Sequence, residues 1–389
     1  MARRLSRRRL LQAVAGAGIA LAATACIGEE SDEVPTVDPE ADETPIVTSV
    51  PGYTDDRRWA DRTLVVATPG DEGSEYLTAQ VEAIFEPFQR LTGATIRTTR
   101  TDLEILQQQV NSGDVEWSIC DVPAEMVLPL ANSGTIAEID YSVVDSSDLF
   151  AELVLPHGVG VSLYATLLAY NEEGLEPGQK PPRSWADFWA TGKYPGFRGL
   201  QEAPIGTLEF ALLAGGATMA DLYPLDVDAA FEQLDRIVED VLLWWRQGAQ
   251  PTQMIANGEL AMVATWHDRI LTLVEGGAPV GFTWNQSQIN GNCWVVPNGA
   301  PESDVAMDFI NFATRPEVSA AFSRLFPFGP VNRRAYDLLD DEARASLPGA
   351  PNLADQQFAI DLEWWFLNGD TVNERFQSWL AEGEPTIED

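Results

Sequence analysis

The sequence predicts an α/β protein with two domains. Short apolar runs that fit buried strands alternate with stretches whose apolar residues recur at helical spacing, and this order occurs in both halves of the chain. The chain has 389 residues, 45% of them hydrophobic and 22% charged, which is long for a single core. No internal repeat is evident, so a solenoid is not expected.

The first half of the chain has the order strand, helix, strand. Apolar residues at helical spacing from 81 to 91 predict a helix that Pro87 kinks and Gly93 ends. Strands separated by helices in this way usually pair in parallel, with helices on both faces of the sheet. The strands expected here are residues 64–67, 95–99 and 117–120.

The second half has a similar order. A capping box at residues 184–187 opens a helix, and apolar spacing from 231 to 242 predicts a long amphipathic helix. Two more helices are expected at 303–314 and 317–325, the second introduced by Pro316. The strands expected here are residues 260–265, 279–283 and 293–296.

Residues 1–25 have the pattern of an export signal. Five arginines precede an uncharged run that is shorter than the roughly 20 residues a spanning helix needs. The paired arginines resemble a twin-arginine signal, and residues 23–26 resemble a lipobox with Ala23 at the usual leucine position. We therefore expect Cys26 to be lipidated, at the outer face of the cytoplasmic membrane; an ordinary cleaved signal peptide is the alternative.

The composition excludes several classes of function. Residues 26–61 are rich in acids and poor in large apolar side chains, so we expect a disordered tether. The formal net charge of -36 leaves no basic stripe for nucleic acid. Three cysteines and two histidines are too few for a disulfide framework or a zinc cluster, and no cofactor is expected. His267 beside Asp268 is the single acid–base pairing, and adjacent residues diverge in direction, so we do not expect an enzyme.

From residue 64 to residue 380 the chain resembles the extracellular solute-binding proteins of ABC importers, and among them the spermidine/putrescine group. Each segment is weak alone, and their order and spacing carry the resemblance. The segments are residues 85–93, 168–171, 182–189, 257–262 with Trp266, 306–312 and 329–332.

The resemblance implies a two-lobed periplasmic-binding-protein-like fold whose lobes are joined by crossing hinge strands. Lobe one would hold residues 62–163 and 292–337, and lobe two residues 164–291 and 338–389. The chain would be a monomer that binds a polyamine-like solute in the cleft between the lobes and delivers it to an ABC permease and ATPase.

The resemblance also implies ligand-binding residues. Trp266 corresponds to a stacking tryptophan, and Asp268 could supply a carboxylate for an ammonium group. Of the acids expected near residues 202–206 only Glu202 is present, and asparagines stand where a tryptophan and an aspartate are expected, at Asn290 and Asn292. These departures favour a shorter or less cationic solute than spermidine.

Other candidates follow from their positions at the ends of predicted strands or near positions that the family uses. Each of them could equally be an ordinary loop acid or a packed aromatic residue. These candidates are Asp71, Glu72, Glu125, Trp284, Asn285, Phe328 and Trp365.

Three questions stay open from the sequence. The family places Cys120 and Cys293 on neighbouring strands, so a disulfide and two buried free thiols are both possible. A sugar or an amino acid could replace the polyamine, because aromatic stacking serves sugars equally well. A receptor could replace the importer as the protein partner.

Overall fold

The computed structural model describes residues 46–71 and 73–383. The predicted export signal, Cys26 and the first part of the predicted tether lie outside these residues, as does Glu72. Among the described residues, no helix combines the length and apolarity that crossing a membrane requires.

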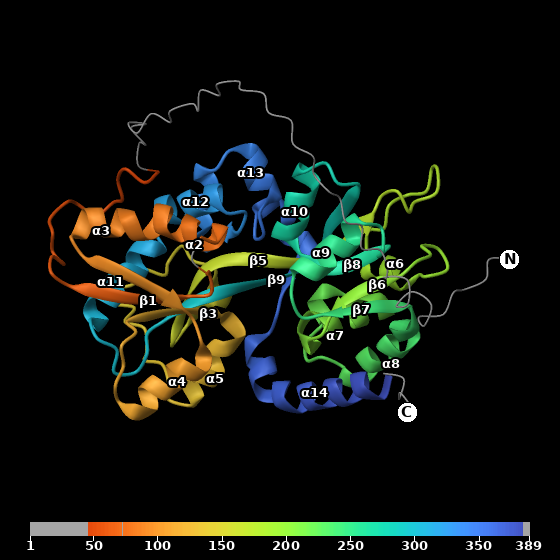
Figure 1. Cartoon of the computed structure of the whole chain (residues 1–389), viewed down its shortest axis with the longest axis horizontal. Helices are drawn as coiled ribbons and strands as arrows, with labels where there is room; N and C mark the ends of the chain where they lie inside the picture. The colour runs from red at the N-terminus through yellow and green to blue at the C-terminus, as the bar shows by residue number, and fades with distance from the viewer. Residues whose placement is uncertain (1–45, 72, 384–389) are drawn as a thin grey trace, which may run out of the picture. The chain divides into compact units, whose positions relative to one another are not determined.

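A single mixed sheet runs through the described part of the chain (Figure 1). Its strands follow the order β2-β1-β3-β9-β5-β8-β6-β7, while β4 and β10 pair with β5 and β11 pairs with β9. The strands are β1 (Thr63–Thr68), β2 (Thr95–Arg100), β3 (Ile119–Pro123), β4 (Val154–Leu155), β5 (Gly158–Asn171), β6 (Arg198–Gln201), β7 (Val241–Trp245), β8 (Met262–Trp266), β9 (Val280–Val295), β10 (Gly329–Pro330) and β11 (Gln357–Ala359).

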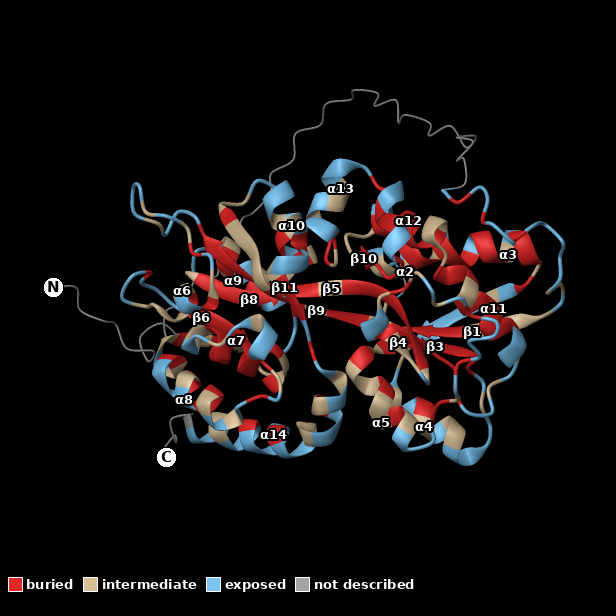
Figure 2. Cartoon of the chain, turned by 180° about the vertical axis from the view of Figure 1, so that it is seen from behind, coloured by how far each residue is buried: buried red, intermediate tan, exposed pale blue. Residues whose placement is uncertain are grey.

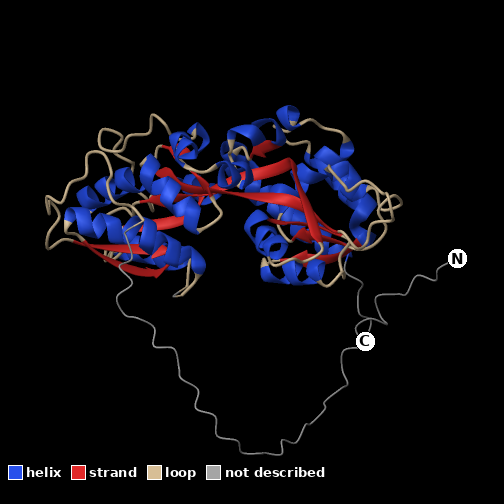
Figure 3. Cartoon of the chain, turned by 90° about the horizontal axis from the view of Figure 1, so that it is seen from above, coloured by secondary structure: helices blue, strands red, loops and turns tan. Residues whose placement is uncertain are grey.

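Two long antiparallel strands, β5 and β9, join the two lobes. Their pairing runs from Val159 opposite Trp294 to Asn171 opposite Val280, with Leu163 opposite Gly291 between. Figure 3 shows strands that pass from one helix-covered lobe to the other. The predicted α/β class with two lobes and crossing strands is therefore confirmed.

Lobe one surrounds β2, β1 and β3 and the adjoining halves of β5 and β9. Val66, Phe88, Val122 and Phe309 are among the fully buried side chains of its core, and burial is concentrated on the strands (Figure 2). Its helices are α2 (Glu75–Gln80), the π-helical η1 (Val81–Phe85), α3 (Glu86–Thr92), η2 (Ala124–Met126), α4 (Leu103–Ser112), α5 (Val127–Asn132), α11 (Ser303–Ala313) and α12 (Pro316–Leu325).

Lobe two surrounds β8, β6 and β7. One cluster of buried side chains, with Trp185 and Phe210, packs on one side of these strands, and a second, with Trp245 and Ile270, packs on the other. A small separate cluster surrounds Tyr336, and Ala343 of α13 (Asp341–Ser346) packs against it. The helices of lobe two are α6 (Trp185–Trp189), α7 (Pro204–Gly215), α8 (Val227–Ile237), α9 (Ala249–Ala256), α10 (His267–Glu275) and α14 (Leu362–Gly383).

Two predicted elements differ from the structure. The helix predicted to residue 242 ends at Ile237, and Val241–Trp245 forms β7, because alternate residues of this run are buried as it pairs with β6. The two strands predicted at 279–283 and 293–296 belong to one strand, β9. The polar residues between them hid its middle from a search for apolar runs.

In lobe one, the structure describes the end of the predicted tether and the state of the two cysteines. Val47, Val50 and Tyr53 are buried in its core, so the last part of the predicted tether packs on the folded body. Cys120 and Cys293 are buried free thiols. They are not opposite each other, since Cys120 faces Val295 across the β3–β9 pair.

Candidate ligand-binding site

The polar residues nearest the hinge follow the carboxyl ends of strands in both lobes. In lobe two, β6, β7 and β8 run in parallel and are followed directly by Glu202, Arg246 and His267. In lobe one, the loop after β1 leads to Tyr76 on α2, and β3 leads to Glu125. Ligands of open α/β sheets bind at such strand ends.

A cluster in lobe one consists of Tyr76, Gln80, Asp121, Ser162 and Asn292, here called the lobe-one cluster. The Tyr76 hydroxyl donates to Asp121 Oδ2 at 2.6 Å, and Gln80 Nε2 donates to the same oxygen at 2.9 Å. Asn292 is opposite Ser162 across the hinge strands and lies beside the Tyr76 hydroxyl and the Asp121 carboxyl. Tyr76 and Asn292 are half-buried, so the cluster reaches the surface through them.

Asp121 is the acid of the lobe-one cluster, and its carboxyl has an unusual electrostatic environment. Its side chain is fully buried, and burial raises the pKa of the carboxyl to about 7, against the opposing effect of the neighbouring polar side chains of Tyr76, Gln80 and Asn292. Asp121 Oδ1 has no hydrogen-bond partner, and neither has the buried hydroxyl of Ser162. Among the described residues, no arginine, lysine or histidine forms an ion pair with Asp121.

Glu125 and Asn290 meet at the middle of the hinge. Asn290 Nδ2 donates to Glu125 Oε2 at 3.0 Å, and burial raises the pKa of Glu125. The Tyr164 hydroxyl lies near both groups. Glu125 was predicted as a candidate, and the structure places it next to the hinge strands.

Phe328 connects these clusters. Its ring lies 5.9 Å from the ring of Tyr76, 5.8 Å from that of Tyr164 and 5.6 Å from that of His267. It precedes β10, which pairs with β5. The predicted candidate Phe328 is therefore part of an aromatic wall beside the lobe-one cluster.

His267 joins lobe two to this wall. Its Nδ1 accepts from the backbone N–H of Ala165 at 3.2 Å, so Nε2 carries the proton and donates to the carbonyl of Pro327 at 2.6 Å. Burial lowers the pKa of His267, so the ring is neutral near pH 7. This ring links the start of α10 to hinge strand β5 and to the segment before Phe328.

Trp266 and Asp268 lie together at the start of α10. The half-buried ring of Trp266 contacts Trp245 edge to face at 5.3 Å and covers Gly248, where a Cβ atom would come within 2.8 Å of it. Asp268 Oδ1 has no partner, and its Oδ2 lies 3.6 Å from Nε of Arg269. The two main predicted residues are thus adjacent to each other at the strand ends of lobe two.

Glu202 forms an ion pair with Arg246, so the ends of β6 and β7 carry one acid and one cation. The Arg246 side chain is largely exposed and Glu202 is mostly buried. Arg246 directly follows Trp245, which contacts Trp266. A carboxylate at this edge would therefore meet the Arg246 guanidinium, which it would share with Glu202.

Four predicted candidates have other surroundings. Asp71 is exposed and pairs with Arg100 at 2.9 Å, at the end of β2 on the outer edge of the sheet. Asn285 Nδ2 donates to the carbonyl of Arg183, which fixes a loop of lobe two. Trp284 packs against His267 and Phe282.

Trp365 is the fourth. Its Nε1 donates to the buried carboxylate of Glu209 at 2.9 Å and to the Tyr223 hydroxyl at 3.1 Å. Glu209 also accepts from the backbone N–H of Gly206 at the bend that opens α7. Trp365 therefore holds α14 against α7 rather than presenting a free indole.

Sequence reasoning missed Tyr76, Asp121, Arg246 and the structural role of His267. A signal for Asp121 existed, since it is an acid inside an apolar run that forms a strand. Tyr76 had no such signal, because it is the second residue of a six-residue helix and resembles any surface tyrosine.

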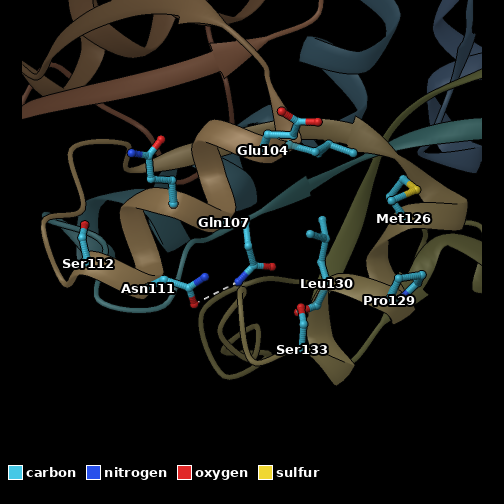
Figure 4. Close-up of a pocket in the computed structure, with 10 residues that line it drawn as sticks. Glu104, Gln107, Asn111, Ser112, Met126, Pro129, Leu130 and Ser133 are labelled. Atoms are coloured by element: carbon cyan, nitrogen blue, oxygen red, sulfur yellow. Dashed lines mark hydrogen bonds between the residues drawn. The ribbon is translucent and has the colours of Figure 1, made fainter.

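Hollows lie at several places in the described part of the chain. A groove of about 770 Å³ runs between α4 and α5 and is lined by residues such as Gln107, Asn111 and Leu130 (Figure 4). A cavity of about 250 Å³ borders the hinge, where Leu163, Ile289 and Asn290 line it. In the described ranges, no group of three or more metal-ligating side chains is found.

Comparison with known proteins places the chain. The family of bacterial extracellular solute-binding proteins matches residues 83–351. A gamma-aminobutyric acid-binding protein of Pseudomonas aeruginosa is 32% identical over 317 residues, which cover 79% of this chain and 89% of that protein. A spermidine/putrescine-binding periplasmic protein of Salmonella typhimurium is 23% identical over 205 residues, 51% of this chain and 57% of that protein.

Solved structures agree with this placement. An ABC transporter substrate-binding protein of Bradyrhizobium japonicum superposes with a TM-score of 0.78 at 32% identity, covering 82% of this chain and 100% of that one. A GABA receptor structure superposes with a TM-score of 0.76 at 31% identity, covering 84% of this chain and 100% of that one. These relatives are binding proteins and not enzymes. The chain belongs to the bacterial extracellular solute-binding proteins and is the substrate-binding protein of an ABC transporter.

Proposed function

We propose that the protein captures a small solute with an ammonium group between its lobes, and that a short ω-amino acid such as GABA is its first candidate ligand. The observation that carries the proposal is the presence of buried acids in lobe one and of a cation, Arg246, and an indole, Trp266, at the strand ends of lobe two. An ω-amino acid needs an acid for its ammonium group and a cation for its carboxylate. A polyamine needs acids alone.

The relatives also support GABA ahead of a polyamine as the candidate ligand. The 32% identical relative, matched over 79% of this chain, is named for gamma-aminobutyric acid. The polyamine-binding relatives match about half of the chain at lower identity. A polyamine such as putrescine is therefore the second candidate.

Thermal unfolding of the purified protein with a solute panel tests the proposal, because a ligand that binds only the folded state stabilises it. The panel contains GABA, putrescine, spermidine, butyrate, butylamine, glutamate and glucose. We expect the largest rise in Tm with GABA and none with butyrate, which lacks the ammonium group. A larger rise with putrescine would favour a polyamine, and no rise with any amine would refute the proposal.

We also propose the lobe limits and anchor that the sequence predicts. Lobe one would comprise residues 62–163 and 292–337, which agrees with the position of the Leu163–Gly291 pair between the two sets of buried clusters. Cys26 would carry the lipid, and the mature protein would be a monomer. Loss of metabolic palmitate labelling in Cys26→Ala would support the anchor, and retained labelling would refute it.

A further inference from the structure

Asp121 is a fully buried carboxylate with one oxygen that has no partner, whereas both oxygens of Asp308 and of Glu209 accept hydrogen bonds. Asp308 accepts from the Tyr53 hydroxyl at 2.8 Å on Oδ1 and from Trp59 Nε1 at 2.6 Å on Oδ2. Glu209 accepts from Gly206 N–H on one oxygen and from two side chains on the other. Asp121 Oδ1 has no such donor.

An unpaired buried carboxylate is costly, and removing it from water is tolerated only where the charge is compensated. The described residues supply two neutral donors to Asp121 and no cation. Asp268 in lobe two also has an open oxygen, but Arg269 is its ion-pair partner. Asp121 is therefore either neutral, with a proton on its carboxyl, or ionised, with its negative charge balanced by a bound cation.

Ser162 gives an independent indication of a ligand at this place. Its side chain is fully buried, and its hydroxyl has no hydrogen-bond partner. It lies on β5 opposite Asn292 and near the Tyr76 hydroxyl. Two buried polar atoms without partners thus adjoin the two half-buried residues that connect the cluster to the surface.

We infer that Asp121 is the counter-ion for the ammonium group of the ligand, which binds at the Tyr76 hydroxyl and Asn292 with Ser162 as a further acceptor. The Tyr76 hydroxyl donates its proton to Asp121 and accepts from Gln80 Nε2 at 3.3 Å, so its second lone pair is left to accept from an ammonium group. The inference rests on the proposed function. It assigns the amine end of the ligand to lobe one and leaves the other end to Arg246 and Trp266 in lobe two.

The assignment makes ligand affinity depend on pH. An ammonium group binds the ionised carboxylate and not the protonated carboxyl, so affinity falls as Asp121 takes up a proton. The titratable groups that face Asp121 are Tyr76 on α2, Cys120 on β3 and Cys293 on β9, and burial raises the pKa of all three further above neutrality. Gln80, Ser162 and Asn292 do not titrate.

Calorimetric titration with GABA at pH 6, 7 and 8 tests the assignment in the wild type and in Asp121→Asn. For the wild type we expect Kd to rise about tenfold from pH 8 to pH 6, as a group with a pKa near 7 gains its proton. For Asp121→Asn we expect Kd at pH 8 at least about tenfold above the wild-type value and little change with pH. Asp308→Asn is the matched control, a buried aspartate with tyrosine and tryptophan donors, and should bind as the wild type does.

Unchanged affinity and pH profile in Asp121→Asn would overturn the assignment while leaving the proposed function intact. A wild type that binds neither GABA nor putrescine would overturn both. If Asp121→Asn does not fold, the wild-type profile and Tyr76→Phe, which removes the acceptor, decide the question. A flat wild-type profile together with full affinity in Tyr76→Phe would refute the inference.

Discussion

Trp266 is the aromatic residue of lobe two that we expect to stack on the ligand. Replacing it with alanine should weaken GABA binding by about 1–3 kcal/mol, the range for a central aromatic anchor, whereas Trp266→Phe should lose less. Trp244→Ala is the matched control, because Trp244 packs on Phe376 and Trp379 of α14. Calorimetry measures the effect. Equal affinities for wild type and Trp266→Ala would show that Trp266 merely covers Trp245 and Gly248.

Asp121 also predicts how the stability of the ligand-free protein varies with pH. Burial raises the pKa of the folded carboxyl to about 7, whereas an unfolded aspartate titrates near 3.9. The folded state therefore binds the extra proton between these values, and its free energy of unfolding falls as the pH rises from about 4 to 7. Asp121→Asn should remove about 2–4 kcal/mol of this pH-dependent loss.

Urea unfolding of both proteins at pH 5 and pH 8 measures this difference. The comparison between variants matters, since other groups also titrate over this interval. If the wild type and Asp121→Asn lose the same stability between the two pH values, the carboxyl of Asp121 is not protonated in the folded protein at neutral pH.

At the residue scale, the sequence predicted where several candidate side chains stand, and their roles toward a ligand stay predictions. Trp266 and Asp268 are adjacent at the strand ends, and Phe328 and Glu125 lie beside the hinge. Asp121 was not found, because its importance arises from burial and missing partners, which exist only after β3, α2 and the hinge strands come together. Trp365 shows the opposite case. It was a candidate ligand-binding residue, but its indole N–H donates to Glu209 within lobe two.

At the scale of elements, α10 is tied to the hinge through one side chain. His267→Phe keeps the ring but leaves the Ala165 N–H and the Pro327 carbonyl without their buried partners. We expect it to lower the free energy of unfolding by about 2–4 kcal/mol. Chemical denaturation checks this. A change below about 0.5 kcal/mol, as for an ordinary surface site, would show that water replaces both hydrogen bonds.

The loop between β7 and α9 positions Trp266. A Cβ atom at Gly248 would lie 2.8 Å from the ring, so Gly248→Ala should displace the indole, although its backbone φ of -62° suits alanine. We expect severalfold weaker GABA binding, in keeping with a displaced aromatic anchor. Gly192→Ala, where a Cβ atom meets no atom within 4 Å, is the control. Equal Kd values for Gly248→Ala and Gly192→Ala would indicate that Trp266 does not contact the ligand.

The elements that the sequence predicted well are those whose apolar residues recur with one clear spacing, either that of a helix or that of a strand. The strands at β1 and β2, the helices α11 and α12 and the left-handed glycine that ends α3 all lie close to their predicted places. The run at β7 was ambiguous because residues 241 and 242 continue the apolar spacing of α8. The middle of β9 was hidden because a hinge strand carries polar residues, such as Asn290 and Asn292, toward the site.

At the scale of the whole molecule, two lobes share a sheet through β5 and β9, and the candidate groups lie on both sides of these strands. This arrangement suits hinge closure around a solute, which is how such proteins present a loaded form to a transporter. The two-lobed fold could be predicted from the order of family segments. The ligand could not, because it depends on a few side chains, and the acids expected for a polyamine are partly replaced by asparagines.

The most direct test of the central claim is calorimetric titration of the purified wild-type protein at pH 8 with GABA and, in parallel, with butyrate and putrescine. We predict saturable binding of one GABA per chain, weaker binding of putrescine and no heat of binding with butyrate. Binding of butyrate as tight as that of GABA, or no binding of either amine, would contradict the claim that buried acids near the hinge select an ammonium group.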